Sequence, residues 1–477
     1  MPDTLSDWLS YLETLHPKTI ALGLERVAQV KQRLQLRPDF PIITVGGTNG
    51  KGSVCAMLES MLHAAGYRVG CYTSPHLLEY NERVRIAKEQ ASDAELCAAF
   101  EKVERARRQQ ITEFNPDNPP APMSPPPCRG RAREGVEAQY SHRFYPPPDL
   151  PPARGKELSD ESVEVPLTYF EFGTLAAIQC FIEHKVEVAI LEVGLGGRLD
   201  AVNVFDSDCA VVASVDIDHT EYLGDTREQI AFEKAGIFRA GKVAIFGDRD
   251  MPAAIATEAH RIGAELWQLG NQFRYAASSQ QWDFHGMNGA RNALPYPALR
   301  GAYQLNNAAA ALAALDVLKD KLPVSMEAVR RGLAEVSLPG RFQVLPGRPQ
   351  IILDVAHNPH AARCLAQNLA GLPPCHKTFA VFAMLKDKDM AGVARALKEQ
   401  VDVWLVAGID APRGASADEL ARVLRTEAVQ GEIMVFPSAQ EAMHHACNVA
   451  AENDRIAAFG SFYTVADVMR ARGLRCG

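Results

Sequence analysis

The sequence lacks the marks of several large protein classes. No apolar stretch among its 477 residues reaches membrane-spanning length. Met1 to His16 carries acidic and polar residues where a signal peptide has a basic and then an apolar start. The ten cysteines form no Cys-x-x-Cys pair and no metal-finger spacing. We therefore expect a cytoplasmic protein that makes no membrane contact and keeps its thiols reduced.

An excess of positive charge is also missing. The chain has 50 Lys and Arg against 58 Asp and Glu, a net charge of -8, which argues against a nucleic-acid partner. An anionic ligand must therefore be bound by groups at its own site and not by the net charge of the protein. The content of 47% hydrophobic and 23% charged residues is typical of a globular protein, and the length suits two or three domains.

Short apolar runs alternate with helical patterns in the first part of the chain. Apolar spacing over Trp8 to Leu36 predicts one or two helices, and another helix is expected over Val54 to Ala65. Strands are expected at Pro41 to Val45, Arg68 to Tyr72, Val186 to Leu191, Cys209 to Val215 and Val243 to Phe246. This alternation predicts an α/β fold with a doubly wound, mostly parallel sheet.

A second set of strands follows. It comprises Gln350 to Val355, Thr378 to Phe382, Val403 to Val406, Ile433 to Phe436 and Ile456 to Phe459. The alanine-rich helix Asn306 to Lys319 and the turn at Leu338-Pro339-Gly340-Arg341 precede it. We expect an ATP-binding domain over residues 1–338 and a smaller, Rossmann-like α/β domain over residues 339–477.

One stretch, Asn115 to Val163, is unusually rich in proline, with twelve of the thirty prolines. Proline fixes its own torsion and removes a backbone donor, so neither a helix nor a central strand is expected there. A solvated insertion is favoured over a polyproline segment that docks a partner.

A glycine-rich loop lies between the first expected strand and the next helix. In such a place backbone N–H groups and the helix dipole bind phosphate, with Lys51 facing the β/γ-phosphates and Ser53 near Mg²⁺. The spacing departs from the Walker pattern, because Gly52 separates the lysine from the hydroxyl residue and Val45 replaces the first glycine. The predicted ATP contacts are Thr48, Asn49, Gly50, Lys51, Gly52 and Ser53. A glycine turn with an accidental lysine is the disfavoured alternative.

Ionisable side chains follow other expected strands. Glu192 ends one strand and His219 closes Asp216-Ile217-Asp218-His219 after the next. Parallel sheets bind ligands at this edge, so both are candidate metal ligands, and Ser74 in Tyr72-Thr73-Ser74-Pro75-His76 is a weaker one. The alternatives are a capping or salt-bridged glutamate and a structural histidine.

Lys234 lies at an otherwise apolar helix end. Burial would favour its neutral amine, which can react with carbon dioxide to give a carbamate, but the spacing alone favours an exposed lysine. In the second domain, Asp354 and His357 follow a strand and Arg341 follows the boundary. Asp354 is expected to accept from ribose hydroxyls and Arg341 to meet phosphate on domain closure; ordinary turn chemistry at Asn358-Pro359 is the alternative.

Together these motifs resemble the dihydrofolate synthase/folylpolyglutamate synthase family, the folate branch of the Mur ligase superfamily. The resemblance spans nearly the whole chain and rests on Gly47 to Ser53, Ser74-Pro75-His76-Leu77, Leu167 to Glu171, Leu191 to Asp200, Asp218-His219-Thr220, Glu233 to Ile237, Leu338 to Phe342 and Asp354 to Pro359. A peptidoglycan-precursor Mur ligase is disfavoured, because the phosphate loop starts near residue 46 and leaves no room for the additional amino-terminal substrate domain.

The resemblance implies a ligase that uses ATP and Mg²⁺, with two ions, to join L-glutamate to dihydropteroate and tetrahydrofolate through an acyl phosphate. It implies that Lys51, Glu192, His219 and Lys234 serve catalysis, that Ser74, Glu192, His219 and the Lys234 carbamate bind metal, and that Asn307, Arg341 and Asp354 contact nucleotide. It implies a monomer and a pterin site made by Ala21, Leu22, Gly23, Leu24, Leu167, Thr168, Tyr169, Phe170, Leu199, Asp200 and Ala201.

Two departures from the family pattern concern the substrate. Ala21 stands where an aspartate is common, and the proline-rich insertion enters just before Leu167. Reaction type is therefore better determined than substrate preference. Two rivals remain: folylpolyglutamate synthase activity alone, and a nucleotide-switched binding protein, which would bind nucleotide without glutamate-dependent turnover. The number of ionisable groups at the strand ends favours chemistry over switching.

Overall fold

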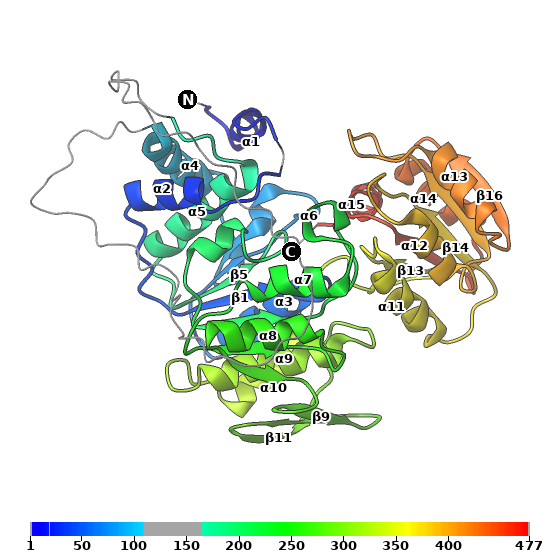
Figure 1. Cartoon of the computed structure of the whole chain (residues 1–477). Coiled ribbons are helices and arrows are strands. Elements are labelled where there is room, and N and C mark those ends of the chain that lie inside the picture. Colours follow the sequence, from blue (N-terminus) through cyan, green and yellow to red (C-terminus); the bar gives the residue numbers. More distant parts are fainter. Residues whose placement is uncertain (1, 19, 109–163, 476–477) are drawn as a thin grey trace, which may run out of the picture.

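The structure is a computed structural model that describes residues 2–18, 20–108 and 164–475. These residues form two bodies, each with helices on both faces of a sheet (Figure 1). The architecture confirms the predicted α/β, mostly parallel fold class. The predicted proline-rich insertion, 115–163, lies outside the described residues.

The first sheet has eight strands in the order β4-β3-β2-β5-β1-β6-β7-β8. The strands from β2 to β8 in that order pair in parallel, while β3 and β4 add an antiparallel edge. The strands are β1 (Ile42–Gly46), β2 (Val69–Tyr72), β3 (Val84–Ile86), β4 (Glu89–Gln90), β5 (Val188–Glu192), β6 (Cys209–Val212), β7 (Val243–Phe246) and β8 (Glu265–Gln268). Parallel pairing brings the carboxyl ends of β2, β5, β1 and β6 to one edge.

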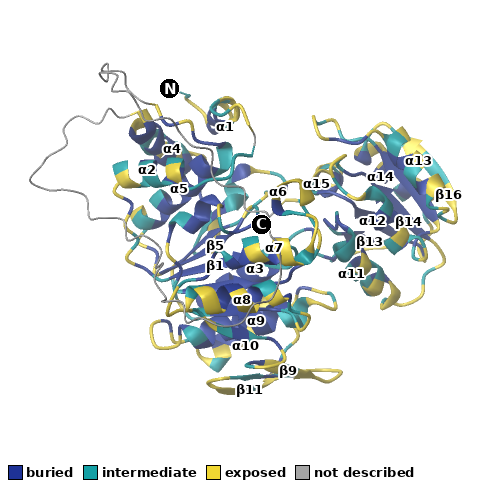
Figure 2. Cartoon of the chain, in the orientation of Figure 1, coloured by how far each residue is buried: buried dark blue, intermediate teal, exposed yellow. Residues whose placement is uncertain are grey.

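Helices cover both faces of this sheet, because successive strand residues point to opposite sides: Ile42 enters one apolar cluster and Ile43 the other. One face carries α3 (Lys51–Ala64), α9 (Gln304–Val317) and α10 (Met326–Glu335). The other carries α1 (Leu5–Thr14), α2 (Glu25–Arg33), α4 (Asp93–Arg108), α5 (Tyr169–Glu183), α7 (Arg227–Ala235) and α8 (Ala253–Ile262). Short turns of helix are η1 (Tyr80–Arg83), η2 (Ala201–Val204) and α6 (Thr220–Leu223). Figure 2 shows the buried strands at the centre of each body.

A small antiparallel sheet, in the order β11-β10-β9, packs beside α9. It consists of β9 (Arg274–Ala277), β10 (Trp282–Gly286) and β11 (Gly289–Leu294). The side chains of Trp282 and Phe284 are buried in the same apolar cluster as the alanines of α9, which attaches this sheet to the first body.

The second body holds a six-stranded sheet in the order β12-β13-β17-β14-β15-β16, parallel except for β12. Its strands are β12 (Gln343–Leu345), β13 (Gln350–Leu353), β14 (Thr378–Phe382), β15 (Val403–Ala407), β16 (Glu432–Phe436) and β17 (Arg455–Phe459). Its helices are α11 (Pro359–Ala370), α12 (Met390–Leu397) and α13 (Ala417–Thr426) on one face, and α14 (Ala439–Val449) and α15 (Phe462–Ala471) on the other. No helix among the described residues is long and apolar enough to cross a membrane.

Two described segments that are far apart in sequence meet where α4 ends. Val165 donates its backbone N–H to the carbonyl of Arg107 over 3.1 Å, and the Arg107 guanidinium pairs with Glu164. Arg107 is buried, and Glu104 pairs with it over 2.5 Å. This clasp holds the two flanks of residues 109–163 together.

Candidate active site

The loop between β1 and α3 is pinned to the segment that follows β6. Thr48 donates its backbone N–H to the carbonyl of Ser214 over 2.8 Å, and its hydroxyl donates to the carbonyl of Asp216 over 3.0 Å. Ser214 also bonds Asn49, accepting its N–H over 3.2 Å. Because α3 begins at Lys51, the N–H groups of its first turn have no acceptor within the helix. The loop thus presents fixed donors of the kind that bind phosphate.

Two lysines converge on one carbonyl of this loop. Nζ of Lys51 and Nζ of Lys234 each lie 3.1 Å from the carbonyl oxygen of Gly47. Lys234 is only 4% exposed, so the expectation of an exposed lysine, drawn from spacing alone, is wrong. Burial, and then the charge of Lys51, lowers the pKa of Lys234 to about 7. Burial also lowers the pKa of Lys51, against the attraction of Glu192.

The carboxylate of Glu192 ends β5 beside the phosphate loop. It is buried and accepts the backbone N–H of Ser74 over 3.1 Å, so the two candidate ligands from β5 and β2 are adjacent. Burial raises the pKa of Glu192, and the nearby Lys51 ammonium opposes that rise. Ser53, on the first turn of α3, is also buried.

Beyond β6, the side chains of Asp218 and His219 meet a lysine of the second body. Lys388 places its Nζ 2.7 Å from the Asp218 carboxylate and 3.3 Å from Nε2 of His219. The cationic neighbours hold the pKa of Asp218 well below its usual range in spite of burial. Burial lowers the pKa of His219 to about 4, so its imidazole is neutral at pH 7, the form that binds metal.

The second body contributes Arg341, Asp354 and His357. Both carboxylate oxygens of Asp354 accept backbone N–H groups, from Phe342 and from Ala356, each over 2.8 Å. The guanidinium of Arg341 lies 5.2 Å from the ring of Phe462. Burial lowers the pKa of Arg341, and the attraction of Asp354 opposes that fall. Burial lowers the pKa of His357 to about 4.

Asn307, near the start of α9, lies against the tip of the phosphate loop. Gly50 has a φ of 86°, and a Cβ built on it would come 2.5 Å from Oδ1 of Asn307. Asn307 is 7% exposed, and its amide nitrogen donates to Gln304 over 3.0 Å. The predicted nucleotide contacts from α9 and from the loop are therefore neighbours.

The residues predicted for the pterin site lie near one another and divide into a buried group and a partly exposed group. Gly23 donates its N–H to the carbonyl of Leu199 over 3.4 Å, and Arg26, just after Leu24, pairs with Glu171, just after Phe170, over 2.8 Å. These segments therefore lie along one part of the first body. Leu167, Thr168, Asp200 and Ala201 are buried, whereas Ala21, Leu22, Gly23, Leu24, Tyr169, Phe170 and Leu199 retain exposed surface.

The buried polar groups of this region already have partners. Thr168 caps α5 by accepting the N–H of Glu171, and the Asp200 carboxylate accepts N–H groups from Leu195 over 2.8 Å and from Val202 over 3.1 Å. Burial raises the pKa of Asp200 to about 7. The carbonyl of Ala21 accepts from Arg26 over 2.8 Å, so this loop is held by its backbone.

The donor set near the phosphate loop suits a magnesium ion. Glu192, Ser74 and Ser53 supply carboxylate and hydroxyl oxygens, which hard divalent cations prefer, and His219 adds a neutral imidazole nitrogen. Among the described ranges, no three or more His, Cys, Asp or Glu side chains form a cluster that could hold a metal. The candidate set has only two residues of those types and relies on serine hydroxyls and on a modified Lys234 for the rest.

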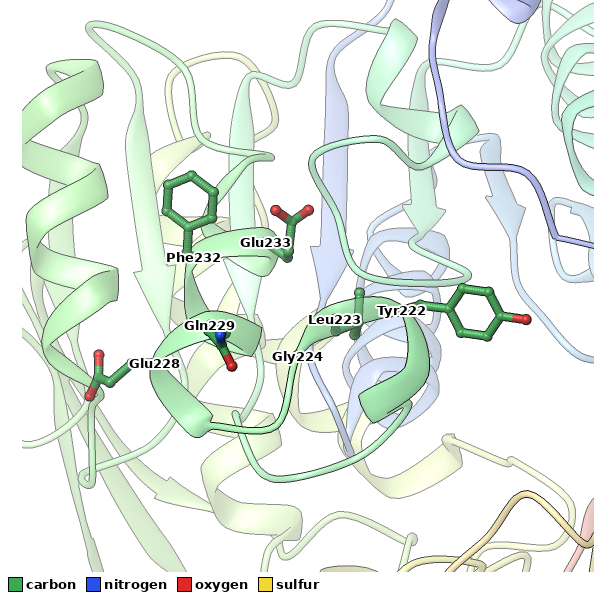
Figure 3. Close-up of a pocket in the computed structure, with 7 residues that line it drawn as sticks. All are labelled: Tyr222, Leu223, Gly224, Glu228, Gln229, Phe232 and Glu233. Carbon is green, nitrogen blue, oxygen red and sulfur yellow. The ribbon is translucent and has the colours of Figure 1, made fainter. Parts of the chain in front are cut away.

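A separate surface pocket of about 430 Å³ lies over α6 and α7. Figure 3 shows the side chains of Tyr222 and Phe232 pointing away from each other. Gln229 and Glu228 are occupied in bonds to the backbone of the helix starts nearby, at Thr226 and Ala254. The pocket contains none of the candidate catalytic side chains.

Sequence reasoning missed two groups of polar residues near the site. Lys388 lies in the loop between β14 and α12, and its partner Asp218 belongs to the other body, so no pattern within either body signals it. Arg83 lies 5.4 Å from the ring of Tyr169 and donates to His76 over 2.8 Å. Arg83 ends η1, directly before the antiparallel edge strand β3, and the sequence pattern did not reveal either element.

Comparison with known proteins identifies the family that this chain resembles. The Mur ligase middle domain matches residues 162–315, and the Mur ligase glutamate ligase domain matches residues 340–462. The chain is 42% identical over 466 residues to the dihydrofolate synthase/folylpolyglutamate synthase of Escherichia coli K12, covering 98% of this chain and 94% of that protein.

Two solved structures resemble the chain over almost its whole length. The structure of E. coli FolC in complex with DHPP and ADP superposes with a TM-score of 0.83 at 40% identity, over 99% of this chain and 98% of that one. A bifunctional folylpolyglutamate synthase/dihydrofolate synthase with Mn, AMPPNP and L-glutamate bound gives 0.81 at 42% identity, with the same coverage.

Proposed function

Since the chain belongs to the dihydrofolate synthase/folylpolyglutamate synthase family of the Mur ligase superfamily, it is an ATP-dependent ligase of folate metabolism that adds L-glutamate to a folate-type carboxylate, and we propose that the groups around the β1–α3 loop perform this reaction. The observation that carries the proposal is the convergence of Lys51 and Lys234 on the Gly47 carbonyl, beside the buried carboxylate of Glu192. An ammonium group, a buried amine that can be modified and a carboxylate at a phosphate loop suit phosphoryl transfer assisted by a metal ion.

ATP would bind with its phosphates on the N–H groups of the loop and the first turn of α3. Thr48, Asn49, Gly50, Gly52 and Asn307 shape this cradle, while Lys51 supplies a positive charge and Arg341 a second one from the other body. Asp354 holds the turn that carries Arg341, because it accepts the N–H of Phe342. This arrangement makes the nucleotide site complete only when the two bodies are together.

Mg²⁺, as one or two ions, would be held by Ser53, Ser74, Glu192, His219 and the carbamate of Lys234. When bound, it neutralises charge on the phosphates and so lowers the barrier to phosphoryl transfer. The buried Glu192 beside Ser74 supports this assignment, since a carboxylate with little solvent needs a positive partner.

A carbamate on Lys234 is supported by the position of the amine. It is buried, it faces the phosphate loop, and the adjacent Lys51 charge disfavours a second ammonium there. Carbon dioxide adds to the neutral amine, one proton leaves, and the product is an anion that replaces an unfavourable cation beside Lys51. The charge change stabilises the site electrostatically.

The ligation has two steps. An oxygen of the substrate carboxylate attacks the γ-phosphorus, ADP leaves, and an acyl phosphate forms; the amine of L-glutamate then attacks the acyl carbon, loses a proton, and inorganic phosphate leaves. Activation is required because a free carboxylate is a poor acceptor. Lys51 stabilises the transferring phosphoryl group, and contact between the two bodies excludes water that would hydrolyse the intermediate.

The acceptor would lie along Ala21 to Leu24, Leu167 to Phe170 and Leu199 to Ala201. The exposed side chain of Leu199 and the rings of Tyr169 and Phe170 offer apolar surface for a pterin. Ala21 offers no side-chain polar group, so a contact that an aspartate would make is absent at this position.

We propose residues 1–338 and 339–477 as the two domains. Support comes from the strands, because the first two sheets end with β11 at Leu294 and the third begins with β12 at Gln343. We also propose a monomer, as the family resemblance implies, and a cytoplasmic location stays a prediction. Sedimentation of the purified protein tests the oligomeric state.

The test of function is phosphate release by the purified protein with ATP and Mg²⁺, with and without L-glutamate, offering dihydropteroate and tetrahydrofolate separately. Release that requires glutamate with both acceptors is expected. Release with one acceptor alone assigns a single synthase activity. Nucleotide binding without release on either acceptor refutes the folate assignment and favours a nucleotide switch or another Mur ligase substrate.

A further inference from the structure

The side chain of Asn358 joins three separate parts of the molecule. It is 2% exposed and lies between β13 and α11, in the second body. Its Oδ1 accepts the N–H of Ala361 over 2.9 Å and so caps α11. Its Nδ2 donates to Oδ1 of Asn49 over 3.2 Å and to Oδ2 of Asp218 over 2.9 Å, and both of these acceptors belong to the first body.

Helix capping alone does not require this amide. A cap needs only an oxygen acceptor, and Ser, Thr or Asp supplies it as well as Asn does. The other helices of the second body use such residues: Asp389 caps α12, and Ser416, Ser438 and Ser461 cap α13, α14 and α15. The cap does not use the side-chain nitrogen of Asn358, and both hydrogen bonds that this nitrogen donates go to the first body.

The partner on the phosphate loop is held in a defined place. Asn49 lies between Gly47 and Gly50, which have φ values of 142° and 86°, and its backbone N–H bonds Ser214 over 3.2 Å. Its side chain returns a bond to Asn358 over 3.4 Å and lies 2.7 Å from Nδ1 of His360. A change in the loop backbone would therefore move the side chain that α11 contacts. Figure 1 shows α11 on the side of the second body that faces the first.

From these contacts we propose that Asn358 is a positioning residue that makes the docking of the second body depend on the conformation of the phosphate loop. The proposal rests on the proposed function, in which this loop binds the phosphates of the nucleotide. Nucleotide in the loop fixes Asn49, Asn49 orients Asn358, and Asn358 places the start of α11, with His357 beside it, over the reaction site. Asn358 itself touches neither phosphate nor acceptor in this scheme.

The test is a double-mutant cycle on kcat/KM for L-glutamate at saturating ATP and acceptor. Asn358→Ser keeps the cap and removes both bonds to the first body, and Asn49→Ser removes the same amide pair from the other side. At about 1 kcal/mol for each hydrogen bond, Asn358→Ser loses two bonds and should reduce kcat/KM about 30-fold, and Asn49→Ser loses the pair with Asn358 and should reduce it about fivefold. Because both variants break the contact between Asn49 and Asn358, the double variant should lose about as much as Asn358→Ser alone, not the product of both.

Asn368→Ser is the matched control. Asn368 lies on the same helix and also crosses between the bodies, where its Oδ1 accepts the N–H of Ala302 over 3.0 Å, but it does not contact the phosphate loop. Its effect should multiply with that of Asn49→Ser. The thermal midpoint of Asn358→Ser should match the parent, since the cap survives.

Multiplicative effects of Asn49→Ser and Asn358→Ser, or a kcat/KM for Asn358→Ser within twofold of the parent, overturn the proposal. If Asn358→Ser does not fold, Asn358→Asp replaces it: two facing carboxylates should reduce kcat/KM, and Asp218→Asn in addition should restore part of it. No recovery overturns the proposal. Failure of the proposed function is distinct, because the parent protein would then show no glutamate-dependent phosphate release.

Discussion

Gly50→Ala tests the geometry of the phosphate loop directly. Gly50 has a φ of 86°, and a Cβ there would lie 2.5 Å from Oδ1 of Asn307. A left-handed conformation costs an alanine about 1–2 kcal/mol, and moving the buried amide of Asn307 away from the nucleotide costs about 1 kcal/mol more. If the loop relaxes when empty, binding must restore this strain, so we expect the ADP dissociation constant to rise about 30- to 150-fold.

Gly66→Ala separates backbone strain from contact. Gly66 also has a positive φ, 95°, but a Cβ there would meet nothing within 4 Å. Gly66→Ala should lose about 1–2 kcal/mol of folding stability and keep its affinity for ADP, whereas Gly50→Ala, whose empty loop relaxes, should lose affinity for ADP and little folding stability. Isothermal titration with ADP and thermal unfolding of both proteins measure this. ADP affinity of Gly50→Ala within threefold of the parent would refute the assignment of the loop and of Asn307.

The remaining predictions concern charge and metal. Lys234→Ala should abolish turnover while ADP binding is largely retained, with partial recovery on addition of a short carboxylate; normal phosphate release would remove the carbamate from the mechanism. In CO₂-free buffer Lys234→Met should be more stable than the parent by up to about 4–5 kcal/mol at pH 7 and below, because burial lowers the pKa from 10.5 to about 7. The folded state is the one with the depressed pKa, so the difference must shrink as pH rises from 7 toward 10.5, and a difference independent of pH in urea titrations would contradict it. Chelation of divalent metal should stop phosphate release, and Mg²⁺ should restore it; release that continues after exhaustive chelation would show that metal is not needed.

Strand positions were predictable where apolar runs are bounded by polar residues. Val243–Phe246 and Thr378–Phe382 form β7 and β14 with the bounds expected from the sequence. The strand expected to reach Val215 ends at Val212, because the next residues leave the sheet and Ser214 bonds the phosphate loop. Local pattern cannot show such a bond between segments far apart in sequence.

The small sheet and the burial of Lys234 were beyond local reasoning. β9 has mostly exposed residues, and the sheet persists because Trp282 and Phe284 pack against α9. Lys234 is buried by a contact with Gly47, 187 residues away in the chain. In both cases tertiary packing determines the outcome, and it overrides the preference that the spacing of apolar residues indicates.

The strand-end rule located Glu192, His219 and Asp354 from sequence, since the end of a parallel strand fixes where its last side chain lies. Which of them carry function stays a prediction. The rule said nothing about the side chains that join the two bodies, Asn358 and Lys388, because their partners are chosen by docking and not by either strand alone.

Because the clasp between Arg107 and Glu164 holds the two flanks together, the folding stability of the first body should depend little on the number of residues between them. In a polymer model, the closure entropy of a connecting segment grows only with the logarithm of its length, by about 0.6 kcal/mol for each doubling. The buried guanidinium of Arg107, paired with Glu164, and the hydrogen bond from Val165 to the Arg107 carbonyl hold the end of α4 beside residues 164–165. We therefore expect a change in the number of residues between these two flanks, such as an engineered insertion, to change the free energy of folding of the first body only slightly.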